Sequence, residues 1–470
     1  MPKQIFLTGA SGNMGNAALE HLLLSHKDIN VRILVLPSEL RHRRIRRWQD
    51  DSRVEVVAGD LRNYGDVLTG VKGADYVLHV GGMVSPGCDR FPELTRQVNV
   101  GGAANIVRAI QEQPDPDAVR LVYIGTVAQT GSRNAPVHWG RTGDPIKISR
   151  YDHYAVTKTQ AEAIVAESGL RYWVSLRQSG MAHPDMWKIF DPIMFHNPIN
   201  GVFEWSTVND SGRLMAMVCR DDVPERFWRS FYNIGGGPSC RVNNHEFMRM
   251  SFEAMTGDYR KVLDPHWIGT KNFHGQWYAD SDVLEQLVPY RSQGLADFMH
   301  DYRRAIPWYV KATARFFPGA IRKRIAGLAH TEGGTMAWIE NNDTEHINAF
   351  FGSRADWERI PKSWDRFDLV SAPTTPVLLD HGYDERVAPD QRDGDMLNQA
   401  AAFRGGACLS DASGGPYRPV RWRCARDHEF DMSPNLFLRG GHWCPQCMVD
   451  PATYDEVARR SPYFRQVWPD

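Results

Sequence analysis

Apolar stretches recur at regular intervals through the first 180 residues, and amphipathic stretches separate them. The apolar stretches are KQIFLTG, VRILVL, VEVVAGD, YVLHVGG, RLVYIGT and YWVSLRQ. They are rich in β-branched residues and nearly continuous in apolar character, as strands are when a parallel sheet buries both of its faces. Segments such as NAALEHLLLSH carry an apolar stripe with helical spacing. Alternation of this kind predicts an α/β domain with a doubly wound parallel sheet.

The pattern loosens after residue 185. FYNIGGG indicates one more strand, NHEFMRMSFEAMTG a helix, and the segment from ADSDVLEQL to FMHDYRR two closing helices. Residues 306–330 are aromatic and basic, and Pro318 interrupts them. We interpret them as an amphipathic helix pair packed on the body, the alternative being a surface helix that meets a membrane or covers an apolar substrate. The predicted organisation is a nucleotide-binding domain over 1–184 with a returning strand near 228–237, a substrate lobe over 185–305, an extension over 306–395 and a small module over 396–470.

Composition excludes several classes of protein. Hydrophobic residues make up 42% and charged residues 24%, which is typical of a globular domain, and the net charge of −1 provides no overall field for nucleic acid or anionic membranes. We find neither a secretory leader nor an apolar run of about 18 residues. Seven cysteines in 470 residues do not form a disulfide framework. We therefore expect a cytoplasmic protein without a transmembrane segment.

A glycine-rich turn comes directly after the first strand. LTGASGNMG places Gly9, Gly12 and Gly15 between that strand and a helix, where a backbone without side chains can approach a pyrophosphate at the helix N-terminus. This context predicts a Rossmann dinucleotide site. Asp60 ends the third strand, where its carboxylate can accept the adenine amino group, and Gly81 leaves room at the end of the fourth strand.

The residues after the second strand bear on which dinucleotide is bound. NAD enzymes usually carry an acid there, whereas this chain has Leu36 and Pro37, with Arg41, Arg43 and Arg44 just beyond. Arginine suits a 2′-phosphate, so the sequence favours NADP over NAD. Glu39 nevertheless lies close enough in the chain to reach a ribose.

The fifth strand ends in Thr126, and the segment YDHYAVTKTQAE brings Tyr154 and Lys158 one helical turn apart. Hydride transfer at a carbinol carbon requires a proton to move at the oxygen, and a tyrosine with a pKa of about 10 is a poor base at neutral pH. A neighbouring lysine ammonium favours the phenolate, and a hydroxyl can hold the substrate oxygen. We therefore predict Thr126, Tyr154 and Lys158 as the catalytic residues.

These motifs resemble the extended short-chain dehydrogenases/reductases, also called the NAD-dependent epimerase/dehydratase family. The matching stretches are TGASGNMG, GDL, HVGG, NVGGAANIV, YAVTKTQAE, SLRQSG and YNIGGG, which span about residues 3 to 305. The resemblance implies that Lys158 also binds the nicotinamide ribose, that the substrate is a nucleotide sugar, and that the protein forms a homodimer. Larger apolar or natural-product substrates stay open because the region from Trp267 to Phe317 is rich in aromatic residues. The predicted cofactor-binding residues are Gly9, Ser11, Gly12, Asn13, Met14, Gly15, Asp60, Leu61, Gly81, Asn99, Tyr154 and Lys158.

Two positions depart from the family pattern. The dehydratase branch carries an acidic pair after the catalytic hydroxyl, whereas this chain has Val127 and Ala128, so water elimination by that route lacks its acid and base. Gln178 stands where the family often has proline after Arg177. Ketone/alcohol redox and epimerisation through a transient ketone both stay open.

The C-terminal segment carries four candidate metal ligands. Cys424, His428, Cys444 and Cys447 have the spacing C-x3-H-x15-C-x2-C, which is typical of a closed, structural tetrahedral zinc site. The segment resembles treble-clef zinc modules, some of which bind nucleic acid, but its acidic residues offset much of its basic character. We expect a folding or docking element, and nucleic acid as an unlikely partner.

The sequence thus predicts an NAD(P)-dependent oxidoreductase or epimerase that transfers a hydride at a secondary alcohol or ketone of a small-molecule substrate. The alternative is a nucleotide-sensing scaffold whose zinc module binds a protein or nucleic acid.

Overall fold

A seven-stranded parallel sheet forms the centre of the computed structural model, which describes residues 2–369, 371–410 and 414–468. Its strands are β1 (Lys3–Thr8), β2 (Ile29–Val35), β3 (Val54–Ala58), β4 (Tyr76–His79), β5 (Arg120–Thr126), β7 (Tyr172–Gln178) and β11 (Ser230–Ile234). Their order is β11-β7-β5-β4-β1-β2-β3, so the predicted doubly wound sheet is confirmed. The order reverses between β1 and β4, and ligands bind outside the carboxyl ends of the strands at such a point.

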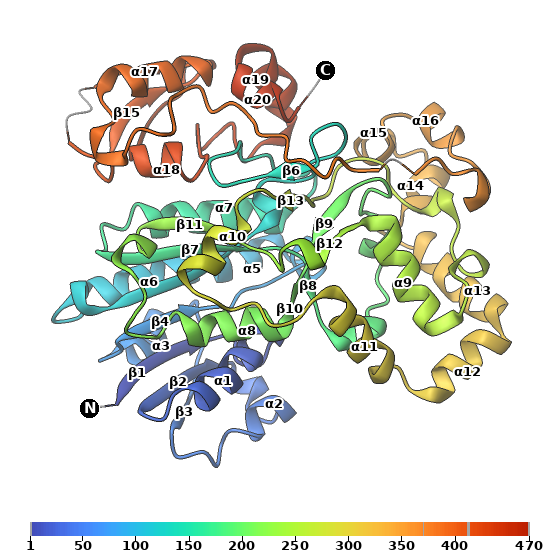
Figure 1. Cartoon of the computed structure of the whole chain (residues 1–470), viewed down its shortest axis with the longest axis horizontal. Helices are drawn as coiled ribbons and strands as arrows, with labels where there is room; N and C mark the ends of the chain where they lie inside the picture. Colours follow the sequence, from blue (N-terminus) through green and yellow to red (C-terminus); the bar gives the residue numbers. More distant parts are fainter. Residues whose placement is uncertain (1, 370, 411–413, 469–470) are drawn as a thin grey trace.

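Helices cover both faces of this sheet (Figure 1). On one face lie α1 (Asn13–Ser25) and α8 (Val208–Met217), and on the other α3 (Tyr64–Val71), α6 (Gly102–Gln111) and α7 (His153–Ala166). Alternation along β1 explains the two layers, because Ile5 and Leu7 pack with the first group and Phe6 with the second. Each strand therefore fixes helices on both sides.

A helical lobe lies beside the sheet, at the right of Figure 1. It contains α9 (Asn244–Thr256), α11 (Leu295–Ala305), α12 (Trp308–Phe316), α13 (Pro318–Ala329), α14 (Thr335–Glu340), α15 (Thr344–Phe351) and α16 (Arg354–Glu358). Ile325 of α13 and Trp364 share one core with Phe195 and Trp267. Residues on both sides of position 306 therefore pack into one lobe.

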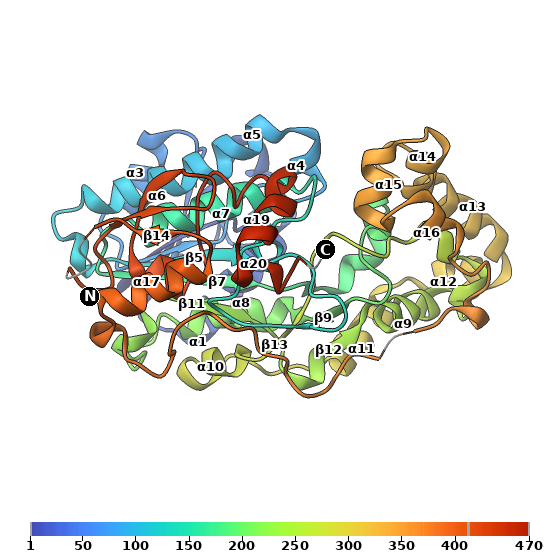
Figure 2. The ribbon, with the colours of Figure 1, turned by 90° about the horizontal axis from the view of Figure 1, so that it is seen from above.

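The C-terminal module lies across the sheet on the side of α7 and β11 (Figures 1 and 2). It consists of α17 (Gly394–Phe403), a three-stranded sheet of β14 (Ala407–Cys408), β15 (Val420–Arg423) and β16 (Glu429–Met432), and the helices α18 (Pro434–Leu438), α19 (Tyr454–Arg460) and α20 (Pro462–Arg465). Its Trp422 and Phe437 belong to the same buried cluster as Trp173 of β7 and Phe231 of β11. The module therefore shares a hydrophobic core with the central sheet.

Short elements connect these regions. They are α2 (Arg43–Arg46), α4 (Gly87–Arg90), α5 (Pro92–Arg96), α10 (Ser281–Leu287), β6 (Trp139–Gly140), β8 (Met181–Ala182), β9 (Val202–Glu204), β10 (Ser206–Thr207), β12 (Arg241–Asn243) and β13 (Trp277–Tyr278). Within the described ranges, no helix is both long enough and apolar enough to cross a membrane.

Candidate active site and metal centre

The glycine turn between β1 and α1 leaves no room for side chains. Gly9 has φ +76°, and a Cβ there would lie 2.7 Å from the Cα of Gly81. A Cβ on Gly15 would lie 2.1 Å from the carbonyl oxygen of Gly9. Glycine is therefore required where β1 and β4 end and α1 begins, and bare backbone meets the N-terminus of α1.

Glu39 and Arg44 both reach this turn. The Ser11 hydroxyl donates a hydrogen bond to the Glu39 carboxylate at 2.9 Å. Arg44 donates to the Ser11 carbonyl at 3.0 Å and to the Asn13 side chain at 2.6 Å. Arg41 and Arg43 are exposed. The sequence favoured an arginine, and hence NADP, with Glu39 as the alternative, and the structure brings both Arg44 and Glu39 to the turn.

Two other predicted cofactor residues are engaged within the protein. Arg62 pairs with Asp60 at 2.6 Å, and its hydrogen bonds lower the pKa of that carboxyl. The Asn99 amide donates to the Met83 carbonyl and to the Thr157 hydroxyl, both at 3.0 Å, and its oxygen accepts from the Met83 amide at 2.8 Å. Asn99 thus joins the segment after β4 to α7.

Met14 and Leu61, also predicted to bind the cofactor, take part in the two hydrophobic cores. Met14 is buried in the core shared by α1 and α8, and Leu61 is partly buried against the core on the other face of the sheet.

The predicted catalytic residues come together at the carboxyl end of β5. Thr126 ends that strand, and its hydroxyl is hydrogen-bonded to Tyr154 in the first turn of α7. Asp152 caps α7 by accepting from the Ala155 amide at 2.8 Å. Lys158 comes one turn later, and its ammonium lies 4.3 Å from the centre of the Tyr123 ring. The hydroxyl and the phenol therefore meet at this end of β5, and the amine follows one turn later on α7.

The electrostatics of this site differ from the sequence-based expectation. Burial raises the pKa of Tyr154 above its usual value, and the hydrogen bond with Thr126 only partly offsets this increase. Burial also lowers the pKa of Lys158 to about 7, although the nearby Glu162 carboxylate opposes the change. In the protein chain alone, desolvation is the largest influence on the tyrosine pKa and raises it, which is opposite to the direction expected from a lysine charge.

A buried polar cluster, which the sequence did not reveal, lies one turn beyond Lys158. The Glu162 carboxylate accepts from Arg177 of β7 at 2.6 Å, from Gln129 at 2.9 Å and from His442 of the C-terminal module at 2.8 Å. Burial would raise the pKa of Glu162, but the Arg177 charge and the bonds from His442 and Arg177 bring it below its usual range. The Gln129 oxygen also accepts from the Thr126 amide at 2.9 Å. The cluster thus connects both ends of the candidate active site with the module.

A cavity of about 320 Å³ lies in the helical lobe. Its wall is aromatic and aliphatic, formed by α9 and the segments around residues 186–199 and 263–273, and no described residue that lines it is charged. The side-chain nitrogens of Trp187 and Trp205 and the Asn244 oxygen are buried at this wall without a hydrogen-bond partner. The cavity therefore suits an apolar ligand with a few polar groups.

Two contacts link the cavity with segments next to the predicted catalytic residues Thr126 and Tyr154. Phe273 lines it, and the carbonyl of Phe273 accepts a hydrogen bond from Ser149, five positions before Tyr154. Val127, which comes directly after Thr126, lies in one hydrophobic cluster with the cavity residues Trp205 and Phe247.

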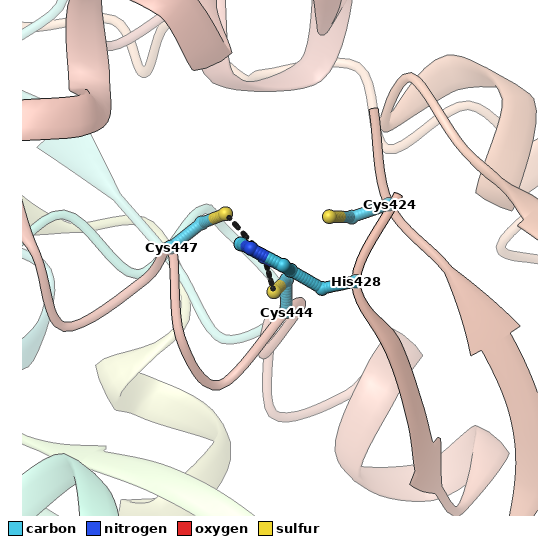
Figure 3. A group of neighbouring side chains, drawn as sticks. All are labelled: Cys424, His428, Cys444 and Cys447. Carbon is cyan, nitrogen blue, oxygen red and sulfur yellow. Dashed lines mark hydrogen bonds between the residues drawn. The ribbon is translucent and has the colours of Figure 1, made fainter. Parts of the chain in front are cut away.

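The four predicted metal ligands converge in the C-terminal module. Ligand atoms of Cys424, His428, Cys444 and Cys447 all lie within 4.8 Å of one another (Figure 3). The His428 Nδ1 is 3.3 Å from the sulfur of Cys444 and 3.3 Å from that of Cys447. Cys408 in β14 of the same module is not part of this group.

The turn that carries Cys444 and Cys447 touches α7 at two levels. Met448 packs with Ala128, Ala155 and the half-buried Tyr154. His442 reaches Glu162 two helical turns further along. A Cβ on Gly441 would lie 2.1 Å from the carbonyl oxygen of Asp144, so the turn approaches the body too closely for any side chain there.

Comparison with known proteins finds similarity in the N-terminal part of the chain. Residues 6–173 match the model of the 3-beta hydroxysteroid dehydrogenase/isomerase family. A UDP-glucose 4-epimerase of Rickettsia bellii is 31% identical over 110 residues, which are 23% of this chain and 32% of that protein. A UDP-glucose 4-epimerase of Rickettsia prowazekii gives the same values. The chain thus spans about a third of the length of the curated relatives that it matches.

Solved structures share the fold over a longer range. A dTDP-glucose 4,6-dehydratase from Streptomyces venezuelae, in a double-mutant form, is 20% identical and matches with a TM-score of 0.50 over 65% of this chain and 96% of its own. The Bacillus anthracis dTDP-glucose 4,6-dehydratase, solved with NAD, is 17% identical, with a TM-score of 0.51 over 66% of this chain and 97% of its own. The fold is that of these dehydratases. The Rossmann sheet expected from the sequence is therefore confirmed.

Proposed function

We propose that the protein is an NAD-dependent oxidoreductase or epimerase that acts on a secondary alcohol or ketone. The observation that carries the proposal is the contact of Thr126 with Tyr154, one helical turn before Lys158, on a sheet whose Gly9–Gly15 turn leaves room only for backbone. The Gly9–Gly15 turn would hold the pyrophosphate of the dinucleotide at the N-terminus of α1. When bound, the nicotinamide supplies the hydride acceptor or donor.

In this mechanism Tyr154 moves the proton at the substrate oxygen. Thr126 holds that oxygen in line through its hydroxyl. Burial raises the pKa of the phenol, so the phenolate requires a nearby cation. Lys158, with a pKa of about 7, is partly protonated at neutral pH and can provide that charge. Val127 and Ala128 supply neither the acid nor the base of a dehydration, so redox or epimerisation is the proposed reaction.

The cofactor is proposed to be NAD, although the arginines after β2 favoured NADP. Glu39 contacts Ser11 within the glycine turn, where its carboxylate can accept from ribose hydroxyls and repels a 2′-phosphate. Arg44 is satisfied by Ser11 and Asn13. We expect NADH to bind at least about tenfold more tightly than NADPH, and Glu39→Gln to reduce that ratio, as measured by fluorescence titration. Tighter binding of NADPH by the unaltered protein would restore the preference for NADP.

The substrate is proposed to be an uncharged, largely apolar alcohol or ketone. The lobe cavity offers two unpaired indole nitrogens and one amide oxygen, and no charged side chain among the described residues lines it. A diphosphate placed there would lack a cation to pair with. The second candidate is a nucleotide sugar, because the matched relatives are UDP-glucose 4-epimerases.

A substrate panel decides between these candidates. We expect NADH to form with hydrophobic secondary alcohols, and no conversion of UDP-glucose or dTDP-glucose. Tyr154→Phe should reduce turnover by about 10³-fold, since proton transfer contributes about 10²–10⁴. Tyr151→Phe is the matched control, because Tyr151 is exposed and its hydroxyl contacts Glu345 in the lobe. Turnover that survives in Tyr154→Phe would exclude this mechanism.

A structural zinc ion is proposed for the C-terminal cluster. Three thiolates and one imidazole suit tetrahedral zinc, and four protein ligands leave no position open for catalysis. We expect about one zinc per chain by elemental analysis, unchanged in Cys408→Ser and lost in Cys424→Ser. Zinc that stays bound in Cys424→Ser would remove this assignment.

A further inference from the structure

The helices α12 and α13 expose an unusual group of aromatic side chains. Trp308 and Phe316 are 79% and 80% exposed, and Tyr309 and Phe317 are 58% and 65% exposed. Of the seven exposed aromatic side chains in the described part of the chain, four fall within these ten residues. Tyr309 and Phe316 are seven positions apart and share a helix face. Packing within the chain does not account for these rings.

The same segment carries only positive charge. Residues 302–330 contain Arg303, Arg304, Lys311, Arg315, Arg322, Lys323 and Arg324, and no aspartate or glutamate. Five of these seven side chains are exposed, whereas Arg322 pairs with Asp264 at 2.8 Å. The whole chain has a net charge of −1, so this concentration of charge is local. Such a surface is complementary to an anionic one.

Other side chains already fill the space on the buried side of α12 and α13, so the exposed aromatic rings cannot turn inward. Ala314 of α12 is buried against Phe247 and Met255 of α9, and Ile325 of α13 packs with Trp267. The inner face is therefore filled already. Figures 1 and 2 both place the two helices at the end of the lobe that is far from the central sheet. The surface is thus not obstructed by the rest of the molecule.

We propose that α12 and α13 bind the surface of an anionic lipid bilayer. Exposed tryptophan and phenylalanine enter the interface between headgroups and acyl chains, while lysine and arginine pair with lipid phosphates. The helices lie in the plane of the membrane and do not cross it. The bilayer fits this surface better than single-stranded nucleic acid does, because the wall that α12 covers belongs to an apolar, uncharged cavity.

The apolar cavity lies close to the exposed surface of α12 and α13, which suggests why this surface would bind a membrane. Phe247 and Met255 of α9 line the cavity and also contact the cluster that contains Ala314. The proposed bilayer-binding helix α12 therefore packs directly on α9, which forms part of the wall of the space proposed for an apolar substrate. Binding to the membrane would bring the cavity to the phase in which such a substrate dissolves.

Sedimentation with lipid vesicles tests the proposal without any measurement of turnover, so it stands apart from the proposed enzymatic function. We expect the full-length protein to bind vesicles that contain about one quarter phosphatidylserine at least about tenfold more tightly than pure phosphatidylcholine. High salt should weaken this binding, because it screens exposed charges.

Variants identify the surface. The double substitution Trp308→Ser and Phe316→Ser, and separately Arg303→Ser with Lys323→Ser, should each reduce vesicle binding about tenfold. Leu24→Ser and Arg386→Ser are the matched controls, because these side chains are 74% and 90% exposed elsewhere in the chain and should bind as the unaltered protein does.

Three results would overturn the proposal. They are an unaltered protein that stays in the supernatant with anionic vesicles, aromatic variants that bind vesicles normally, and binding of a single-stranded oligonucleotide, but not of vesicles, that depends on Trp308.

Discussion

The C-terminal module and the helix pair α12–α13 lie outside the segment that matches the family model, and they meet the rest of the molecule in opposite ways. The module buries charge at its contact, where His442 reaches the Glu162–Arg177 pair with all three side chains at most 1% exposed. The helix pair buries small residues such as Ala314 and leaves Trp308 and Phe316 in solvent. A buried polar contact fixes one arrangement, whereas an exposed apolar face indicates a partner. The module is therefore an integral part of the folded body, which agrees with its shared core, and the exposed helix pair is the surface proposed above for interaction.

The largest expected effect comes from removing a metal ligand. Cys444→Ser removes one of the four ligands of the proposed zinc, and with the metal the support for the core around Trp422 and Phe437, which also covers Trp173 and Phe231. We expect the melting temperature to fall by more than about 10 °C in a calorimetric scan. Cys408→Ser in the same module should melt within about 2 °C of the unaltered protein. Equal melting of the two variants would mean that the metal does not support the shared core.

A smaller effect is expected from the buried contact itself. His442→Leu leaves part of the Glu162 carboxylate without a partner, and we expect a loss of about 3 kcal/mol in unfolding free energy by denaturant titration. The exposed pair of Glu55 with Arg32 provides the control, because Glu55→Gln should cost less than about 1 kcal/mol. A loss in His442→Leu no larger than in the control would show that the module does not depend on this bond.

The variant Glu162→Gln tests whether the buried cluster influences the proposed reaction through Lys158. The Glu162 carboxylate raises the pKa of Lys158 against the lowering by burial, and the net value is about 7. Removing the carboxylate removes that increase, so Lys158 loses its proton at a lower pH. We therefore expect the alkaline limb of the pH–rate profile to move to lower pH, whereas Glu55→Gln leaves it in place. An alkaline limb that does not move in Glu162→Gln would mean that the protonation of Lys158 does not determine it.

The smallest effect on stability is expected in the helix pair. Trp308→Ser and Phe316→Ser should each change the unfolding free energy by no more than about 0.5 kcal/mol, because the rings are exposed. Phe350→Ala in the same lobe is the buried counterpart and should cost about 3–5 kcal/mol. A large cost at Trp308 would mean that its ring packs within the folded chain and does not serve as a binding surface.

Sequence periodicity predicted the sheet because its strands are continuous apolar runs. Phe6 and Leu7 are neighbours in the six-residue strand β1 and pack into the cores on opposite faces of the sheet. An uninterrupted apolar run in the sequence is therefore enough to predict a strand that is buried on both faces. Tyr154 and Lys158 could be paired because four positions make one helical turn and because a strand ending in a hydroxyl precedes them.

Other parts of the site depend on contacts that no local pattern records. The four-residue spacing of Lys158 and Glu162 was present in the sequence, but nothing marked Glu162 as buried or as the partner of His442, which is 280 positions away. The cavity is lined by side chains scattered from Met186 to Tyr302. The expected pKa of Tyr154 was wrong in direction for the chain alone because charge was considered and desolvation was not.

The distance along the chain between α7 and His442 also has a consequence for biosynthesis. A ribosome that adds about 5–20 residues per second needs roughly 15–55 seconds to proceed from Glu162 to His442, which lies 280 residues later. During that interval α7, β7 and β11 are completed in turn, and the apolar surface around Trp173 and Phe231 then has no cover until the module is made. The N-terminal half must therefore be kept from aggregating until translation delivers the module. With the proposed zinc bound there, zinc availability would also become a condition for the yield of folded protein.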